Sequence, residues 1–176
     1  MTTVTTTINT ENNTEININT DNNSVHHYTY QFSDCIFNET KRIIKENIQL
    51  INVSDILSNF CKIHHNSVII DYRFFALIAI PENYEMFKLY LVNNIIEILS
   101  KYSALIIHLN FNNIKLIDID KHSVFFMNII KYMGEIFPDK LDKCYIYGSG
   151  LLYQGIYSLI SVVLTRTTRQ RIVIVK

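Results

Sequence analysis

The sequence lacks a net charge. Its 176 residues carry 16 Lys and Arg against 16 Asp and Glu, and 48% of them are apolar. Proteins that bind nucleic acid usually carry an excess of basic residues that neutralise phosphates, so the balance argues against nucleic acid as a partner. A chain of this length is expected to fold as one domain with a sizeable core.

Cysteine is scarce as well. Cys35, Cys61 and Cys144 are odd in number and far apart, so no disulfide framework is predicted. Free thiols suit a reducing compartment, and we expect a cytoplasmic protein. Cys61 would share a helix face with His64 or His65, but no third ligand stands nearby at suitable spacing. The sequence therefore predicts neither a metal site nor a cofactor.

Residues 1–24 lack both basic residues and a long apolar run. Fifteen of these positions are Asn or Thr. A segment with so few apolar groups cannot offset the entropy of ordering, so a disordered tail is predicted. Without a basic start and an apolar stretch, the segment is not a signal peptide. A single domain is expected to begin at Val25.

From Val25 onward, apolar residues recur at spacings typical of alternating helices and strands. Helices are predicted over Asp34–Ile51, from Ser54 to Phe60, and over Glu82–Tyr102, Val124–Phe137 and Leu151–Leu164. Strands are predicted at Ser67–Ile70, Phe74–Ile80, Ala104–Phe111, Cys144–Tyr147 and Arg171–Val175. This alternation indicates an α/β domain with a mostly parallel central β-sheet flanked by helices. Residues 25–66 are expected to form a short helical N-terminal part, and residues 67–176 the α/β part.

No charged residue occurs between Lys143 and Arg166. This run of 22 residues is long enough to span a bilayer. Gly148-Ser149-Gly150 interrupts it, however, and polar residues make its second half amphipathic, so a buried strand followed by an apolar helix is favoured. The glycines lack the spacing of a dinucleotide fingerprint, and Ser149 lacks the frame of a nucleophile elbow. We interpret them as a tight turn from strand to helix.

The last twelve residues contain four cations and no acid, namely Arg166, Arg169, Arg171 and Lys176. One interpretation is a solvated basic chain end. The other is a contact for a phosphate or a membrane headgroup beside the apolar helix, because guanidinium groups suit phosphate well. The residues themselves leave both interpretations open.

Residues 137–147 read Phe-Pro-Asp-Lys-Leu-Asp-Lys-Cys-Tyr-Ile-Tyr. They resemble the Y-P-E-R-x-x-K-x-Y-I-I segment of the CRAL-TRIO lipid-exchange family. Leu151–Leu164 resembles the apolar gate helix of that family, and Thr165–Ile172 resembles its T-x-x-K-I tail. The resemblance covers Arg73–Val175. It implies a CRAL-TRIO-like fold and a soluble lipid-binding or lipid-transfer protein that is not an enzyme.

In phosphatidylinositol-transfer members of the family, an acid after the proline and a threonine and a lysine near the end of the gate segment contact the headgroup. The matching residues are Asp139, Thr168 and Arg171, so the resemblance implies a headgroup site with Asp for Glu and Arg for Lys. It also implies a lipid pocket under a gate helix that contributes Leu151, Leu152, Ile156, Leu159, Ile160 and Val163. The expected partners are a phospholipid, such as a phosphoinositide, or another hydrophobic ligand, with transient contact to membrane surfaces.

The sequence also departs from the family pattern. Gly148-Ser149-Gly150 replaces the usual Asn-Ala-Pro, and only Val25–Ile70 could stand in for the helical N-terminal half. A second hypothesis is therefore a protein-interaction module that has the fold, a protein partner and no lipid cargo. The interior distinguishes the two hypotheses, because a cavity of roughly several hundred cubic ångströms favours lipid and a packed interior favours a protein partner.

Overall fold

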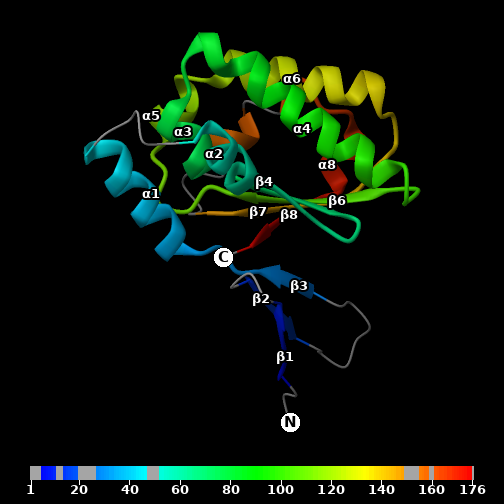
Figure 1. The fold of residues 1–176 in the computed structure, drawn as a ribbon. Helices are drawn as coiled ribbons and strands as arrows, with labels where there is room; N and C mark the ends of the chain where they lie inside the picture. Colours follow the sequence, from blue (N-terminus) through cyan, green and yellow to red (C-terminus); the bar gives the residue numbers. More distant parts are fainter. Residues whose placement is uncertain are drawn as a thin grey trace.

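A five-stranded sheet forms the centre of the domain (Figure 1). The computed structural model describes residues 5–10, 14–19, 27–46, 52–148, 155–158 and 161–175. Within these ranges the strand order is β4 (Cys61–His64), β5 (Ser67–Asp71), β6 (Leu105–Asn110), β7 (Leu141–Tyr147) and β8 (Ile172–Val175). β4 and β5 pair antiparallel, and β5 to β8 run parallel. The predicted α/β class with a mostly parallel sheet is confirmed.

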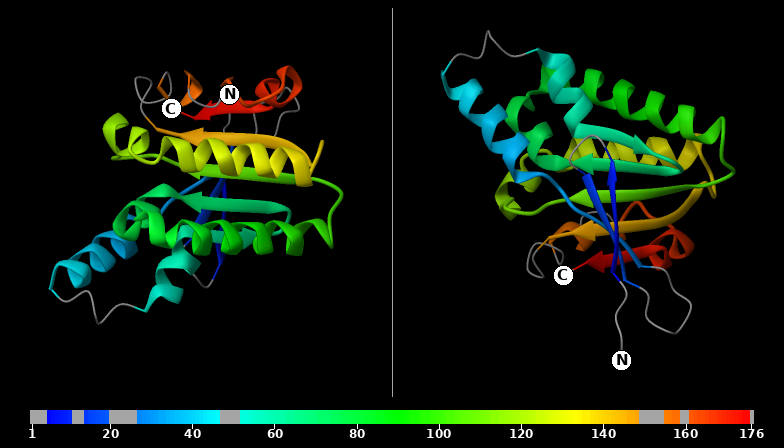
Figure 2. Two further views of the ribbon diagram at one scale, coloured as in Figure 1. Left: turned by 90° about the horizontal axis from the view of Figure 1, so that it is seen from above. Right: turned by 60° about the horizontal axis from the view of Figure 1, so that its bottom comes forward.

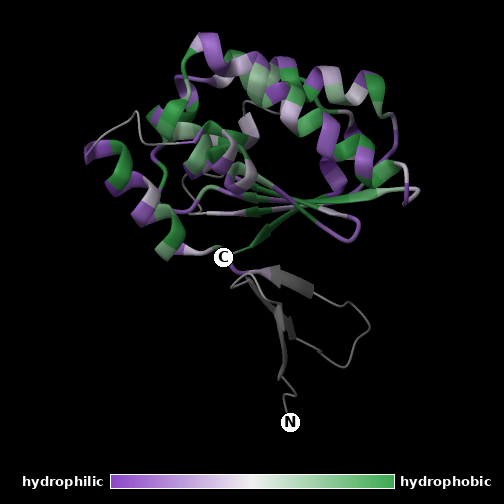
Figure 3. Ribbon diagram, in the orientation of Figure 1, coloured by the Kyte–Doolittle hydropathy of each residue, from purple (hydrophilic) through white to green (hydrophobic). Residues whose placement is uncertain are grey.

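The helices either precede the main sheet or connect its parallel strands, and several of them cover one face of the sheet (Figure 1). They are α1 (Asp34–Glu46), α2 (Val53–Phe60), α3 (Tyr72–Ile78), α4 (Tyr84–Leu99), α5 (Leu116–Asp120), α6 (Ser123–Ile136) and α8 (Arg166–Gln170). α1 and α2 are the helices that precede the main sheet. Figure 2 shows, from above, α4 and α6 lying along the strands. In Figure 3 both helices carry hydrophilic and hydrophobic residues, as expected for amphipathic helices with one face on a sheet.

The structure corrects one predicted strand. Phe74–Ile80 was expected to be a strand because it is continuously apolar, but Phe74 to Ile78 belong to α3. Asp71 begins this helix, since its backbone is extended and its side chain accepts a hydrogen bond from the Arg73 backbone N–H at 3.1 Å. A short apolar run is compatible with either a buried strand or a buried helix, and here the N-cap favours the helix.

β4 is a strand of the main sheet that the sequence analysis did not predict. α2 ends at Phe60, and the chain then enters β4 with Cys61. Cys61 and His64 therefore lie three residues apart on a strand, where their side chains point to opposite faces, and they do not share a helix face as expected. The predicted helical part, residues 25–66, thus contains a strand of the main sheet.

A separate antiparallel sheet precedes α1. Its strands are β1 (Thr5–Thr10), β2 (Thr14–Asn19) and β3 (His27–Tyr30), and Figure 1 shows it below the main sheet. β1 and β2 fall within residues 1–24, for which disorder was expected. Thr and Ile are frequent in both strands, and their branched side chains favour extended structure. The division of the chain at residue 24 stays a prediction.

Aromatic rings fill one part of the layer between sheet and helices. Phe75 of α3 is completely buried, and its ring centroid lies 4.8–6.2 Å from seven neighbouring rings. These neighbours come from α2, α3, α4 and α6 and from the residue before α6: Phe60, Tyr72, Tyr84, Phe87, His122, Phe125 and Phe126. We call these eight residues the aromatic cluster. It joins α3 to α4 and α6 by close ring contacts.

Candidate functional site

Apolar side chains alternate with polar ones along the central strands. On β6, Ile107 and Leu109 point to the helices, whereas His108 and Asn110 point to the opposite face of the sheet. β7 repeats the pattern, with Ile146 on the helix side. The helix side of the sheet is thus an apolar floor.

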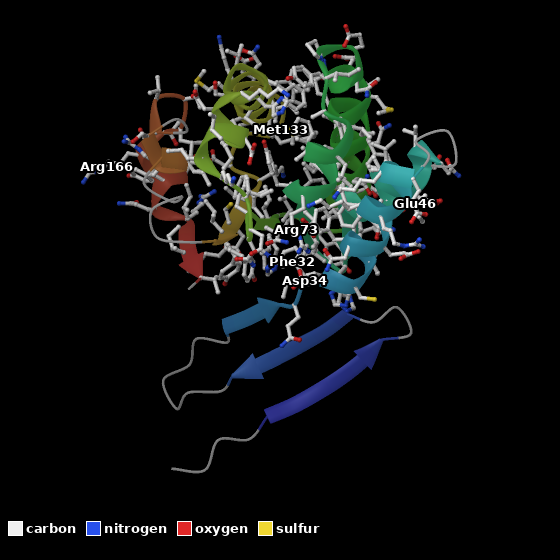
Figure 4. All side chains as sticks on the ribbon, turned by 90° about the vertical axis from the view of Figure 1, so that its left-hand side faces the viewer. Phe32, Asp34, Glu46, Arg73, Met133 and Arg166 are labelled. Carbon is white, nitrogen blue, oxygen red and sulfur yellow. The ribbon has the colours of Figure 1, made fainter. Side chains whose placement is uncertain are left out.

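A cavity of about 550 Å³ lies between this floor and the helices. Its walls are mainly apolar and come from distant parts of the chain, including Leu91 of α4, Ile130 and Met133 of α6, and Ile172 of β8. Figure 4 labels Met133 above the sheet. Ile107 and Leu109 are only half-buried although β6 is the middle strand of the sheet, because they face the cavity. The interior is hollow here.

The three predicted headgroup residues line the same cavity. Asp139 follows α6, Thr168 lies in α8, and Arg171 directly follows α8. Further polar and charged side chains in this lining are Ser123, Lys131, Glu135, Lys140 and Thr165. The structure therefore brings together residues that are 32 positions apart in the sequence. The cavity has both an apolar interior and polar wall residues, as a site for an amphiphile requires.

Asp139 has a backbone conformation that explains its residue type. Its φ is 59°, in the left-handed region. The Lys140 N–H donates to the Phe137 carbonyl at 3.3 Å, so Pro138 and Asp139 are the central residues of a β-turn. A turn with proline first and a positive φ second is of type II. Asp tolerates a positive φ better than most residues with longer side chains, which accounts for Asp in place of Glu.

Arg171 is held against β7 by two contacts. Its guanidinium donates a hydrogen bond to the Leu141 carbonyl, and its own carbonyl accepts one from the Cys144 N–H at 2.9 Å. Guanidinium has five N–H donors, so others are available for an anion in the cavity. The side chain is half-buried, and the anchored part of the guanidinium fixes the orientation of the rest.

Thr168 is oriented by the N-cap of α8. The Thr165 side chain accepts a hydrogen bond from the Thr168 N–H at 3.1 Å, and the two hydroxyl oxygens are 2.8 Å apart. Because Thr165 caps α8 and lines the cavity with Thr168, both hydroxyls belong to the candidate site.

The predicted gate helix is described only in part. Ile156 and Val163 line the cavity, and residues 155–158 are helical. Leu151, Leu152, Leu159 and Ile160 lie outside the described residues. Gly155 contacts Leu116 of α5 closely, since a Cβ at Gly155 would lie 2.2 Å from Leu116 Cδ1. A side chain at this position would require the end of the Leu116 side chain, which is 47% exposed, to move aside.

The sequence analysis missed the contribution of α6 to the site. Lys131 and Glu135 are one helical turn apart on α6 and line the cavity with Met133 and Gly134. The only signal was the amphipathic pattern of Val124–Phe137, from which no more than a helix flanking the sheet was predicted. The apolar face of this helix covers the cavity as well as the floor.

The opposite face of the sheet carries a buried polar network. His108 Nδ1 lies 2.8 Å from the Tyr147 hydroxyl oxygen, which also accepts a hydrogen bond from the Tyr30 N–H at 3.0 Å. Burial lowers the pKa of His108 to about 4 and raises that of Tyr147 to about 12, so both side chains are neutral at pH 7. This network ties β3 to the sheet and is separated from the cavity by the sheet itself.

A buried ion pair joins α1 to the end of β5. Arg73 is 1% exposed, and its guanidinium bonds to Asp71 at 2.8 Å, to Asp34 at the start of α1, and lies 4.8 Å from the Phe37 ring centroid. Figure 4 shows Arg73, Asp34 and Phe32 together, with Arg166 at the outer side of the domain. The contacts of Arg73 are structural, because the residue does not line the cavity.

No group of three or more potential metal ligands occurs among the residues that the structure describes. Burial raises the pKa of the Cys61 and Cys144 thiols to about 12, so neither ionises at neutral pH. In the described ranges no helix is long and apolar enough to cross a membrane. The charge-free run from 144 to 165 lies partly outside those ranges.

The model of the CRAL/TRIO domain family matches residues 17–176. The chain belongs to the CRAL/TRIO family. This CRAL/TRIO chain is also similar to the crystal structure of Sfh5, with a TM-score of 0.57 and 14% sequence identity. The similarity covers 78% of this chain and 55% of Sfh5, so the chain spans about half the length of that structure, and it shows a shared fold. No curated protein matches the sequence. The predicted family is confirmed, and with it membership of a family of lipid-binding proteins.

Proposed function

We propose that this CRAL/TRIO protein binds a lipid in the cavity, with the polar group of the lipid against Asp139, Thr168 and Arg171. One observation carries the proposal. Residues selected by family resemblance alone, at the headgroup and in the gate segment, line a single apolar cavity. Each methylene group that leaves water for such a cavity contributes about 0.8 kcal/mol, so a long chain supplies ample binding free energy.

The polar residues have complementary roles in the proposed site. The Arg171 guanidinium and the Thr168 hydroxyl donate hydrogen bonds to a phosphate, and the Asp139 carboxylate accepts them from headgroup hydroxyls such as those of inositol. Binding and release involve no covalent step, so the proposal does not make the protein an enzyme. The three free cysteines suit a cytoplasmic protein that meets membranes only at their surface.

The cavity also bears on the alternative of a protein-interaction module without cargo. That hypothesis expects large side chains to fill the space beside the gate segment. A cavity of about 550 Å³ instead falls within the range of ligand pockets, which is roughly 300–1,000 Å³. The hollow interior therefore favours lipid over a protein partner as the main ligand.

The proposal is tested by extracting the purified protein with organic solvent and identifying co-purified lipid by mass spectrometry. Uptake from vesicles that contain labelled phosphatidylinositol is the second measurement. An empty extract together with no uptake from the vesicles would contradict lipid binding.

Arg171→Glu tests the headgroup site. Loss of a charged hydrogen bond and introduction of repulsion should weaken phosphoinositide binding at least tenfold. Arg169→Glu is the matched control, because Arg169 lies in α8 only two residues before Arg171 but is absent from the cavity lining. Circular dichroism would check that both variants fold. Equal affinities of the two variants would count against the assigned headgroup site.

A further inference from the structure

We propose that α8 and the residues just before it dock on an anionic membrane surface. The docking face consists of Val162, Arg166 and Arg169, and it lies next to the proposed headgroup site. The inference rests on the proposed function only for the cargo that the membrane would supply, because docking itself needs no bound lipid. It follows from the distribution of charge along the chain, from the lack of acids beside the two arginines and from the exposed valine.

The neutral charge of the whole chain conceals a separation of charge. Residues 1–164 carry 12 cations and all 16 acids, whereas residues 165–176 carry four cations and no acid. The two parts therefore have net charges of −4 and +4. A negatively charged surface attracts the second part and repels the first, so it orients the molecule with α8 toward the surface.

The cations of α8 are not balanced by acids. Arg166 is exposed and Arg169 is half-buried, and both lie on one side of the helix because they are three positions apart. Neither forms an ion pair with a described residue. By contrast, Arg42 of α1 pairs with both Glu39 and Glu46. Neighbouring like charges on a helix repel each other, and an anionic partner would offset this repulsion.

Val162 favours a membrane over an acidic protein as the partner. Its side chain is 80% exposed, the highest value among the exposed large hydrophobic residues that the structure describes. The next residue, Val163, lines the cavity. An apolar side chain beside guanidinium groups suits the bilayer interface, where apolar groups enter the acyl boundary and cations stay at the phosphates. A surface of carboxylates alone would offer the valine no apolar contact.

The docking face is close to the cavity. α8 has five residues and spans about 8 Å. Thr168 belongs to this helix and Arg171 follows it, and both line the cavity. Figure 4 shows Arg166 at the outer side of the domain, pointing away from it. A membrane surface on α8 would therefore lie beside the proposed headgroup site, where a lipid could pass between membrane and cavity.

Docking is tested by sedimenting the full-length protein with vesicles. One set contains phosphatidylcholine only, and the other contains phosphatidylcholine and phosphatidylserine in equal amounts. We expect binding to the second set alone, and weaker binding as salt is added, because salt screens exposed charges. Equal binding to both sets would overturn the inference. Capture on polyglutamate beads without binding to vesicles would also overturn it, in favour of an acidic protein as the partner.

A pair of double variants tests the location of the docking face. Arg166→Glu with Arg169→Glu should weaken binding to the anionic vesicles at least tenfold, because each cation near such a surface strengthens binding roughly fivefold. Lys41→Glu with Lys45→Glu is the matched control. It changes the net charge equally, but α1 lies on the opposite side of the domain from α8 (Figures 1 and 4). Equal losses in the two double variants would overturn the inference.

Circular dichroism checks that these variants fold. If the charge reversal in α8 prevents folding, Arg166→Gln with Arg169→Gln makes the same test with a smaller expected loss. Val162→Ser should also weaken binding to the anionic vesicles, and Val124→Ser, at an exposed position at the start of α6, is its control. Unchanged binding of Val162→Ser would overturn the assignment of this valine to the docking face.

Soluble short-chain phosphatidylinositol separates docking from lipid binding, because it reaches the cavity without a membrane surface. The α8 and α1 double variants should both bind it as the unmodified protein does. A protein that binds the short-chain lipid but not the anionic vesicles would overturn the inference and support the proposed function. A protein that binds the vesicles but no short-chain lipid would support docking and contradict the proposed function.

Discussion

The two faces of the five-stranded sheet differ in how tightly they are covered. On the helix side, Ile107 and Leu109 are apolar and half-buried beside a cavity. On the opposite side, their neighbours His108 and Asn110 are polar and only 5% and 0% exposed. A void beside an apolar group loses dispersion contacts, whereas a void beside a polar group loses a hydrogen bond, which costs more. The fold thus leaves space where side chains need no partner.

We call the face that carries His108 and Asn110 the polar face. One hydrogen-bonding group on this face has no partner among the described residues. Asn110 Oδ1 accepts a hydrogen bond from the Asn112 N–H at 3.0 Å, but its Nδ2 has no partner among the described residues. The polar face therefore tolerates one buried amide group without a hydrogen bond among the described residues. The following variants compare how much each face contributes to stability.

The largest effect is expected from Arg73→Met, which leaves the buried carboxylate of Asp71 without its cation. Removing one member of a buried pair costs about 3–5 kcal/mol, measurable by urea unfolding. Arg42→Met is the control, because Arg42 pairs with Glu39 and Glu46 on the exposed surface and its loss should have little effect. Similar unfolding midpoints for Arg73→Met and Arg42→Met would show that the ion pair between Arg73 and Asp71 contributes little to stability.

A pH dependence is expected from His108. Its pKa in the folded protein is about 4, below the ordinary 6.5, because burial disfavours the imidazolium. The unfolded chain therefore binds a proton first, and stability that is fully present above pH 6.5 is lost as the pH falls toward 4. At about 1.4 kcal/mol per pKa unit, the loss is about 3 kcal/mol.

The control for this prediction is His108→Gln, which removes the titration and retains a polar side chain. Its unfolding free energy should fall less steeply in the same pH window. Some slope should remain, because burial also lowers the pKa of His64 and of His122. An unchanged slope in the variant would assign the pH dependence to those other histidines.

A smaller effect is expected on the cavity face. Ile107→Ala should cost about 1 kcal/mol, because the side chain already borders empty space and leaves little new cavity. Ile56→Ala, at a completely buried position outside the cavity, should cost about 2–5 kcal/mol. Thermal unfolding of both variants without lipid measures the difference, and equal costs would mean that the two sites are packed alike.

The smallest expected effect is an increase in the stability of the folded protein. Gly134 of α6 lines the cavity, and a Cβ placed on it meets no atom within 4 Å. Gly134→Ala should stabilise the protein by about 0.5–1 kcal/mol through helix propensity alone. A rise in the thermal midpoint would confirm the space beside α6. A fall would show that this part of the wall needs glycine.

Sequence patterns predicted the elements whose periodicity is clear. α4, α6, β6 and β8 were all expected close to their observed positions, because each has a clear pattern of apolar residues. Phe74–Ile80 was predicted wrongly because a short, wholly apolar run has no period, and its helix depends on the side chain of Asp71. β4 was missed because its partner, β5, decides its structure.

Part of the lining of the candidate site could be named from the sequence, but its shape could not. Asp139, Thr168 and Arg171 could be named because the family segment has an unbroken spacing. The cavity could not be predicted, because its volume depends on how α4, α6 and the aromatic cluster pack over β6. The positive φ of Asp139 and the hydrogen bond from Arg171 to the Leu141 carbonyl also depend on the folded structure and could not be predicted from the sequence.

β8 contributes Ile172 to the cavity and is an end strand of the main sheet, paired to β7 alone. Hydrogen bonds at such an edge open with less free energy than those at the centre, as amide exchange measures. The cavity therefore borders an edge of the sheet, where local opening is easier than at the centre. We expect that fraying of Ile172–Val175 would expose the side of the cavity that Ile172 lines, while β5, β6 and β7 stay paired.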